Sequence, residues 1–254
     1  MTPRLVDTHC HLDQFEDPQA VLAVAAAQGV ARVVAVSEDP ESMQAVLELK
    51  RRFPRRVAAG IGLHPAWVVR RARPEIERAL SRMAEQADEA DLIGEIGLDY
   101  KWAGSAEEQA LQREILQAQL EIAAACEKPV CLHSRRALRQ TLEQAVAFRR
   151  RTRLNVQMHW FTHSKKLIRI CNEEGIFVSV GPTVVGHGPT QEAAKAIDDG
   201  LLLLETDAPV PVQGRKGHPA RTREVAEVVA ELKGVSWEEI AERTASNFAR
   251  FTGR

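Results

Sequence analysis

The sequence has few of the features that mark disulfide-stabilised or membrane-bound proteins. It has four cysteines among 254 residues, and none of them form a Cys-x-x-Cys pair. A chain of this length can bury a sizeable core without disulfides, so we expect reduced thiols and a cytoplasmic protein. No apolar run approaches the ~20 residues needed to span a bilayer, and Asp7, His9 and His11 interrupt the segment where a signal peptide would lie. We therefore expect no membrane association.

Net charge is almost absent as well. The 34 lysines and arginines oppose 35 acidic residues, which leaves a formal charge of −1. The chain as a whole therefore lacks a field that would attract a polyanion, and a site for DNA or another phosphate-bearing substrate must come from a local patch. No linker, low-complexity tract or clear short repeat is visible, so we expect residues 1–254 to form a single domain. Nothing indicates an obligate protein partner.

Short β-branched runs alternate with longer amphipathic stretches along the whole chain. The predicted strands lie near Arg4–His9, Arg32–Val36, Val57–Ile61, Leu92–Ile96, Pro129–Leu132, Asn155–His159, Ile176–Val180 and Leu201–Glu205. Predicted helices include Pro18–Gln28, Glu41–Arg51, Pro74–Ala87, Glu107–Cys126, Ser164–Glu174, Pro189–Ile197, Ala220–Lys233 and Ser236–Phe251. Alternation of this kind over about 250 residues favours an α/β fold, the closed TIM (β/α)8 barrel. A doubly wound open sheet is the alternative.

The first predicted strand ends in a polar run with two histidines. Because strand side chains alternate, we expect Asp7, His9 and His11 to share one face, with Thr8 and Cys10 on the other. Two imidazoles two residues apart on one face can bind one cation. Two polar residues at a strand end are the simpler interpretation.

Residues near later strand ends favour the metal interpretation. Glu95 lies at the end of the fourth strand, His133 and His159 at the ends of the fifth and sixth, and Asp207 follows the eighth. In a parallel barrel all of these ends point to the carboxyl-terminal mouth, where barrel enzymes place their chemistry. Without partners, so many histidines and carboxylates would be costly to desolvate. The sequence therefore predicts a metal site at the mouth.

The donor types favour two divalent ions as cofactors. Histidine and carboxylate without thiolate suit Zn²⁺, Mn²⁺ or another divalent ion such as Mg²⁺. Six donors are too many for one tetrahedral ion with an open position, but enough for two ions that share a carboxylate. Two ions roughly 3.5–4 Å apart can hold a hydroxide and stabilise an in-line displacement.

Two carboxylates receive catalytic roles in this prediction. Glu95 lies on the central strand between the two histidine pairs, so we expect it to bridge the ions. Asp207 can bind metal and also accept the proton of the attacking water. Glu205 is the rival base, but it lies two residues earlier and therefore deeper in the barrel.

Basic and aromatic residues gather in the loops that follow strands. They are Arg70, Arg71, Arg73, Lys101, Arg135, Arg136, Lys165, Lys166, Arg215 and Lys216, with Trp67, Trp102, Trp160 and Phe161. Cations on phosphates and rings under unstacked bases are how proteins hold single strands, whereas mixed solvated loops are the plainer interpretation. Arg149–Arg151 follow a helix and are interpreted as helix-end cations on the far face.

Three further residues are candidate substrate-binding residues. Arg135 is a phosphate-binding candidate, and His64, before Pro65, is a candidate donor to phosphate. Asp99 is expected to orient either a metal ligand or an incoming group.

Several segments together resemble the TatD-like deoxyribonuclease family of the metal-dependent, amidohydrolase-like barrels. The matching segments are Val6–Asp13, Gly62–Pro65, Gly94–Tyr100, Leu132–Arg135, Leu204–Pro209 and Ala245–Phe251. The resemblance implies a two-metal site and phosphodiester hydrolysis, with DNA as the usual substrate. It also implies two ligand sets: His9, His11, Glu95 and Asp207 for one ion, and Glu95, His133 and His159 for the other.

The sequence departs from the family pattern around the mouth. Trp160 and His163 replace a usual Cys and Gly, and Arg136 replaces a usual acidic residue. The run Lys216–Pro219, which contains His218, replaces Arg-Asn-Glu-Pro.

Three functional classes follow from these observations. The leading hypothesis is a two-metal phosphodiesterase that acts on DNA ends or single strands. The alternative is an ester or amide hydrolase on the same ligands, for example an aminoacyl-tRNA deacylase. A purely binding protein is disfavoured because it needs no such ligand cluster.

Overall fold

A computed structural model describes residues 4–161 and 165–253, and within them all strands belong to one parallel sheet. The strands are β1 (Leu5–Cys10), β2 (Val30–Val36), β3 (Val57–Ile61), β4 (Leu92–Asp99), β5 (Val130–Arg135), β6 (Val156–Met158), β7 (Phe177–Val180) and β8 (Leu202–Leu204). Strand order follows chain order, and each neighbouring pair is parallel. This is the predicted TIM barrel, and the open doubly wound alternative is wrong.

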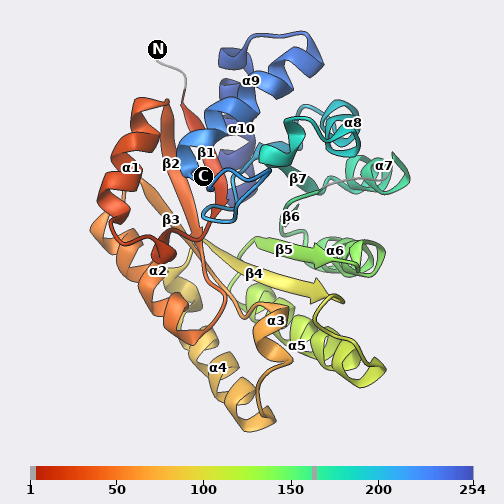
Figure 1. The fold of residues 1–254 in the computed structure, drawn as a ribbon. Helices are drawn as coiled ribbons and strands as arrows, with labels where there is room; N and C mark the ends of the chain where they lie inside the picture. Colours follow the sequence, from red (N-terminus) through yellow and green to blue (C-terminus); the bar gives the residue numbers. More distant parts are fainter. Residues whose placement is uncertain (1–3, 162–164, 254) are drawn as a thin grey trace.

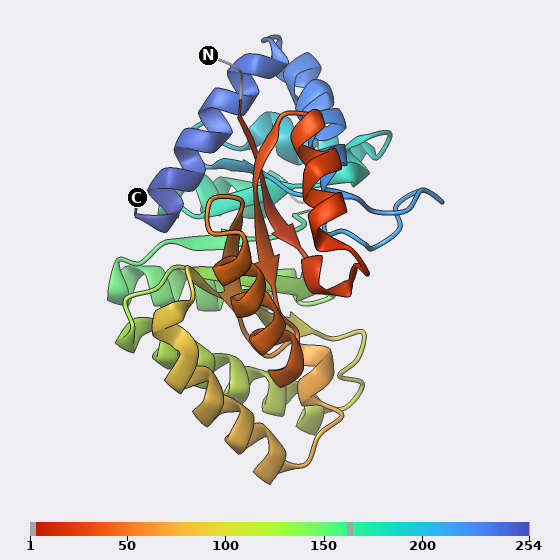
Figure 2. The same ribbon diagram turned by 90° about the vertical axis from the view of Figure 1, so that its left-hand side faces the viewer.

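Helices surround the strands (Figures 1 and 2). They are α1 (Pro18–Ala27), α2 (Pro40–Arg52), α3 (Pro65–Val68), α4 (Arg73–Gln86), α5 (Ala106–Ala125), α6 (Leu138–Thr152), α7 (Lys165–Glu174), α8 (Gly188–Ala196), α9 (Thr222–Lys233) and α10 (Trp237–Thr252). Short 3-10 turns are η1 (Leu12–Gln14), η2 (Ala87–Glu89), η3 (Pro182–Val184) and η4 (Pro219–Arg221). Among the described residues, no helix combines the length and apolarity that a bilayer crossing requires.

The predicted elements agree with the observed ones within a few residues, with local differences. Strand β4 continues to Asp99, three residues beyond its predicted end, and the short helix α3 was not predicted. The predicted start of α9 lies in η4. His163 and Ser164 lie outside the described residues.

Local sequence explains where several helices begin. Ser105 accepts a hydrogen bond from Glu108 N, and the Glu108 carboxylate accepts one from Ser105 N, which makes a capping box for α5. Proline occupies a first-turn position in α1 and α2, where its missing N–H costs nothing.

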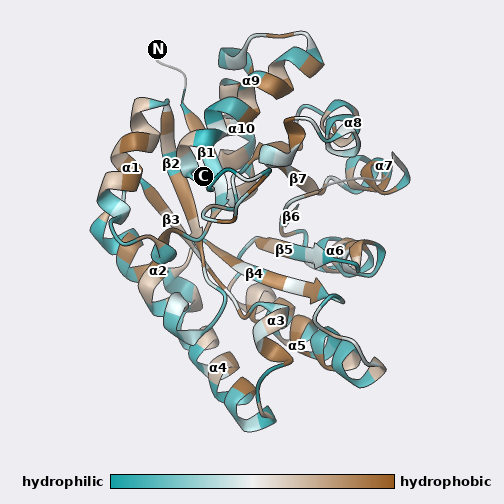
Figure 3. Cartoon of the chain, viewed as in Figure 1, coloured by the Kyte–Doolittle hydropathy of each residue, from teal (hydrophilic) through white to brown (hydrophobic). Residues whose placement is uncertain are grey.

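Two buried layers of apolar side chains support the barrel. The larger layer joins alternate strand residues, such as Ile93 and Val178, to the helices around them. The smaller joins Leu92 and Phe177, the first residues of β4 and β7, to Phe251 of α10. The strands are accordingly the most hydrophobic part of the ribbon (Figure 3). Apolar filling therefore extends to the amino ends of strands, while polar side chains lie toward the carboxyl ends.

The seam between β8 and β1 is closed by residues that follow β8. Asp207 N donates to His9 O at 2.9 Å, and His11 N donates to Ala208 O at 2.7 Å. Cys10 and Ala208 form a parallel bridge. The same backbone contacts that complete the ring thus bring the first and last candidate ligands together.

One prediction for β1 is wrong, because side-chain alternation breaks in this strand. The pairing register with β2 shifts between Asp7 and Cys10. Thr8 consequently contacts the Gln157 side chain, and the Asp7 carboxylate accepts hydrogen bonds from Thr206 N and Oγ1 at 2.9 and 2.5 Å. Asp7 therefore holds the seam and does not share the face of His9.

Strands β4 and β5 approach too closely for a side chain at Gly97. This residue has φ +152°, and a Cβ built on it would lie 2.1 Å from His133 O. Gly97 is also the pairing partner of His133. A glycine is therefore required at position 97. Because it has no side chain, the backbone of His133 can approach this closely.

Candidate metal centre

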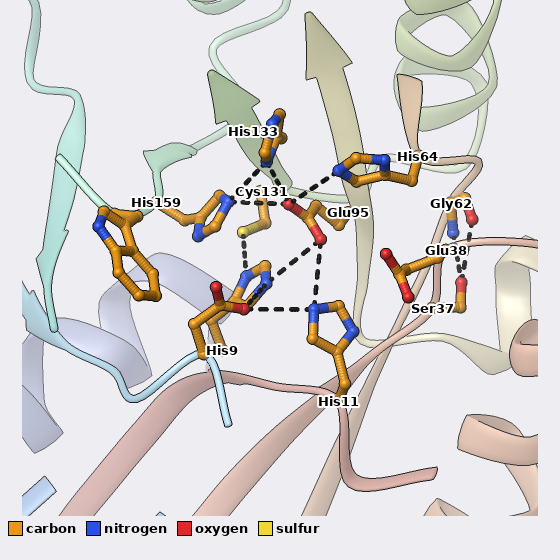
Figure 4. A network of polar contacts seen from close by, with 12 residues as sticks. His9, His11, Ser37, Glu38, Gly62, His64, Glu95, Cys131, His133 and His159 are labelled. Carbon is orange, nitrogen blue, oxygen red and sulfur yellow. Dashed lines mark hydrogen bonds and ion pairs between the residues drawn. The ribbon is translucent and has the colours of Figure 1, made fainter. Parts of the chain in front are cut away.

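The predicted ligands in or just after β1, β4, β5 and β6 meet around the carboxylate of Glu95 (Figure 4). Its Oε2 lies 3.4 Å from His9 Nε2 and 3.6 Å from His11 Nε2. Its Oε1 lies 2.6 Å from His133 Nδ1 and 2.8 Å from His159 Nε2. Each oxygen of one carboxylate therefore faces a different pair of imidazoles.

Asp207 completes the group on the Oε2 side. Its Oδ1 lies 3.2 Å from His11 Nε2 and 3.5 Å from His9 Nε2. The residue has φ 52°, a left-handed conformation uncommon outside glycine, and the seam hydrogen bond to His9 O holds it there. The backbone contacts of the seam are thus what aim this carboxylate at the histidines.

The donor set fits divalent metal ions. Asp207 Oδ1 and His9 Nε2 are buried without a hydrogen-bond partner among the described residues, although buried polar atoms normally have one. Three groups have ligand atoms within 4.8 Å of one another: His9, Glu95 and His159; His9, His11 and Asp207; and His64, Glu95 and His133. All are nitrogen and carboxylate donors, as Zn²⁺ and similar ions prefer.

Electrostatics keeps Glu95 ionised. Burial alone would raise the pKa of Glu95, but its interactions with the surrounding imidazoles, His159 foremost, outweigh burial and lower it well below its ordinary value. The carboxylate is therefore in the form that binds a cation.

His11 and His64 shift in opposite directions. Burial would lower the pKa of His11, but the hydrogen bond and charge of Asp207, together with Glu95, raise it to about 10. Burial dominates at His64, where the pKa falls to about 3 despite the charge of Glu95. His64 is thus neutral at physiological pH, whereas the His11 proton balances part of the carboxylate charge.

Asp99, predicted to contact substrate or orient a ligand, is 1% exposed and lies behind His133. Its Oδ2 is 3.2 Å from His133 Nε2, and its Oδ1 accepts a hydrogen bond from Lys101 N. In α5, Gln112 exchanges hydrogen bonds with the Asp99 backbone and so fixes the end of β4. The geometry supports the orienting role.

Glu205 is a second carboxylate behind the histidines. Its Oε1 accepts a hydrogen bond from Trp160 N, and its Oε2 accepts one from Ser179 Oγ, both at 2.6 Å. The same Oε2 lies 3.7 Å from His159 Nδ1. With both oxygens engaged in a fully buried position, Glu205 is poorly placed to accept a proton from water at the mouth.

Sequence reasoning gave no role to Cys131, the third neighbour behind the ligands. Its Sγ lies 3.3 Å from His9 Nδ1 (Figure 4). Only its alternation with His133 along β5 hinted that both side chains face the barrel interior. Thus His133 and His9 each have a partner behind the ring, as is usual for metal-binding imidazoles, and His159 has the Glu205 carboxylate nearby at 3.7 Å.

His64 lies inside the cluster, although it was predicted to reach substrate. Its Nδ1 accepts a hydrogen bond from Ala66 N, and its Nε2 lies 3.7 Å from Glu95 Oε1. Ser37 Oγ exchanges hydrogen bonds with the Gly62 backbone and so fixes the preceding turn (Figure 4). Because Nδ1 accepts, the ring proton of neutral His64 resides on Nε2, which points into the site.

A pocket of ≈ 650 Å³ opens beside the cluster. His133, His159 and Asp207 form its inner wall, and its lining also includes Arg135 and Trp160. Arg135, a predicted phosphate contact, is exposed at this wall.

Five of the other predicted mouth cations have partners. Arg71, Arg73 and Arg215 pair with Glu75, Glu114 and Glu224 respectively. Arg70 and Lys101 lie over the ring of Trp102, at 4.5 and 5.3 Å from its centroid.

Two further predictions, one for an aromatic residue and one for a basic residue, have different outcomes. Phe161, predicted as a mouth ring, is 1% exposed and belongs to the core. Arg149, interpreted as a helix-end cation, donates to Glu174 O and Leu154 O, in agreement with that interpretation.

Comparisons with known proteins show the family of this chain. The TatD related DNase family matches residues 6–253. Human deoxyribonuclease TATDN3 is 31% identical over 259 residues, covering 96% of this chain and 92% of its own. YcfH, an uncharacterized metal-dependent hydrolase of Escherichia coli strain K12, is 33% identical over 264 residues, covering 97% and 94%. The crystal structure of the E. coli TatD homologue YJJV matches with a TM-score of 0.87 and 27% identity, covering 100% of both chains. This chain therefore belongs to the TatD-related DNase family, and it is a hydrolase of that family.

Proposed function

We propose that the protein is a two-metal phosphodiesterase that cleaves DNA at ends or in single strands. The observation that carries this proposal is the position of the Glu95 carboxylate, whose two oxygens face separate pairs of histidine rings. A bridging carboxylate between two ions has this arrangement. The family relationship to proteins named deoxyribonucleases supports DNA as the substrate.

The ligands divide into two sets that share Glu95. His9, His11, Glu95 and Asp207 would hold one ion, and Glu95, His133 and His159 the other. Zn²⁺, Mn²⁺ and Mg²⁺ are candidates, and the excess of imidazole favours Zn²⁺ or Mn²⁺. Ions bound there would activate water and stabilise negative charge on the phosphoryl group.

Asp207 is the proposed general base. Its side chain is 13% exposed and belongs to the pocket wall, so it can reach both the histidines and an entering water. It accepts the proton of the attacking water and returns it to the leaving oxygen. Glu205, with both oxygens hydrogen-bonded, serves instead to orient His159.

Two residues are proposed to hold the phosphate. His64 Nε2 donates its proton to a phosphate oxygen, because Nδ1 is occupied by Ala66 N. Arg135 contacts the phosphate from the pocket wall. Asp99, by contrast, fixes the His133 ring.

The ester or amide hydrolase alternative has less support. A small closed apolar pocket would favour it, whereas the pocket found here contains several arginines. Aminoacyl-tRNA keeps a phosphate backbone, so the two functions are best separated by assay.

A reconstitution assay tests the proposal. Metal-stripped protein receives each divalent ion singly and is offered 5′-labelled and 3′-labelled single-stranded DNA, and aminoacyl-tRNA. We expect DNA cleavage with at least one ion and none without metal. Deacylation of tRNA with no cleavage of DNA would overturn the proposal.

A further inference from the structure

We propose that the pocket beside the metal centre binds a terminal phosphomonoester of the strand, so that the enzyme selects phosphorylated ends. The inference rests on the proposed function and adds a substrate class to it. We call the site the arginine pocket and define it by Ser134, Arg135, Arg136, Arg139, Gln140 and Trp160.

Three arginine side chains give the pocket its positive charge. Arg135, Arg136 and Arg139 are exposed and make no ion pair with any described residue. Farther along α6, Arg150 and Arg151 pair with Glu174 and Glu121. Guanidinium groups that line one pocket without an ion-pair partner repel one another, and a bound anion removes that repulsion.

The pocket wall offers further donors. Ser134 Oγ is buried and has no hydrogen-bond partner among the described residues. Leu138, Arg139 and Gln140, the first turn of the 15-residue helix α6, also line the pocket. The N-cap residue, Ala137, supplies no side-chain cap, so the amide groups of this turn remain available to an anion.

Size and position fit an end nucleotide. A volume of ≈ 650 Å³ lies in the range of pockets for small ligands and not of grooves that follow a duplex. His133, His159 and Asp207 belong to the same wall, so a group in the pocket lies next to the reacting phosphate. The indole of Trp160, another wall residue, can pack against the terminal sugar or base.

Charge distinguishes a terminal phosphate from an internal one. A phosphomonoester carries about −1.5 to −2 at pH 7, whereas an internal phosphodiester carries a single charge. The three guanidinium groups of the pocket match the monoester better. Arginine also binds terminal phosphate oxygens with paired, charge-assisted hydrogen bonds.

The test compares short single strands that differ only in their ends: 5′-phosphate or 5′-hydroxyl, and 3′-phosphate or 3′-hydroxyl. The metal-loaded parent is compared with Arg136→Gln and Arg139→Gln. Arg151→Gln is the matched control, because Arg151 lies on the same helix but pairs with Glu121 at 2.8 Å. For one of the two ends, we expect the parent and the control to prefer the phosphate in kcat/KM by at least about tenfold. Both pocket variants should lose this preference.

Two results would overturn the pocket assignment. One is a parent enzyme that cleaves phosphorylated and hydroxyl ends equally well. The other is a pocket variant that slows both kinds of strand by the same factor, which would mean that the arginines hold an internal diester.

Separate probes distinguish this failure from failure of the proposed function. Bis(p-nitrophenyl) phosphate is a diester without a terminal phosphate, and no cleavage of it or of DNA by the parent with any ion would refute phosphodiesterase activity. Thymidine 3′,5′-bisphosphate binding, measured by calorimetry, tests the pocket without turnover. Arg139→Gln should bind it at least about tenfold more weakly than Arg151→Gln does, and equal affinities would overturn the pocket.

Discussion

The carboxylate of Glu205 lies directly behind the ring of His159, with Oε2 3.7 Å from Nδ1. The opposite ring nitrogen, Nε2, faces Glu95. Trp160 N and Ser179 Oγ hold the Glu205 oxygens in place. One candidate ligand therefore has a buried carboxylate behind it that lies outside the candidate metal groups.

Glu205→Gln should weaken metal binding without unfolding the barrel. The amide keeps the shape but loses the charge that favours an Nδ1 proton on His159. We expect metal affinity, measured by titration with a chelating indicator, to fall by about 10–100-fold. Activity should recover at high metal concentration. Glu121→Gln, at the exposed pair with Arg151, is the control. Parent-like affinity in Glu205→Gln would refute the orienting role.

Glu95→Ala should lower the metal content of the protein and abolish turnover. The reason is that each ligand set loses an oxygen when this one carboxylate is removed. Elemental analysis of the purified variant gives the stoichiometry, and circular dichroism verifies the fold. Full metal content in Glu95→Ala would exclude a bridging role.

Asp207→Asn should separate chemistry from binding. The amide retains an oxygen that can bind metal but cannot accept a proton. We expect turnover to fall by roughly 10²–10⁴-fold while much of the DNA affinity remains. Single-turnover cleavage measures the rate, and fluorescence anisotropy measures strand binding. A rate near that of the parent would show that the water needs no such base.

Metal binding should release protons. The pKa of His11 is raised from 6.5 to about 10, so this ring is charged at neutral pH and must lose its proton to bind a cation. Metal affinity should therefore rise with pH up to about 10. The stability of the metal-free protein has the opposite pH dependence. The raised pKa of His11 stabilises the fold fully below pH 6.5, and this stabilisation is lost as pH rises through about 10. Calorimetry in two buffers with different ionisation enthalpies counts the protons, and a count of zero at pH 7 would contradict the prediction.

Strand affinity should depend on salt through the mouth cations that form no ion pair with a described carboxylate. Each contact between a cation and a phosphate contributes roughly −0.7 to the slope of log affinity against log salt for single strands. Arg70→Gln and Arg135→Gln should each flatten that slope. Arg150→Gln should not, because Arg150 pairs with Glu174 away from the mouth. Equal effects from all three variants would show that the strand does not bind at the mouth.

The sequence was sufficient to predict the barrel and the proximity of the candidate ligands. Eight strand-like runs and the rule that parallel strands share a carboxyl end place residues as distant as His9 and Asp207 at one mouth. Alternation failed only where the register of β1 shifts, since nothing in the letters from Asp7 to Cys10 reveals an irregular pairing.

Contacts behind the ligands were harder to foresee, because each depends on the exact approach of two strands. The sequence shows that Asp99 and His133 follow neighbouring strands, but not that their side chains meet. The pairing of charges was equally hard to foresee. Arg71 and Arg135 look alike in the sequence, but Arg71 forms an ion pair with Glu75, four residues later, and Arg135 forms none with a described carboxylate.

The seam of the barrel makes metal content a property of the whole ring. Asp207 N bonds to His9 O and His11 N bonds to Ala208 O, so separating β8 from β1 also separates the donors of the first ligand set. An ion held by that set would be lost when the seam opens, and by linkage a bound ion would oppose opening. The fraction of molecules with an open ring would therefore depend on the free metal concentration around the protein, in addition to its packing.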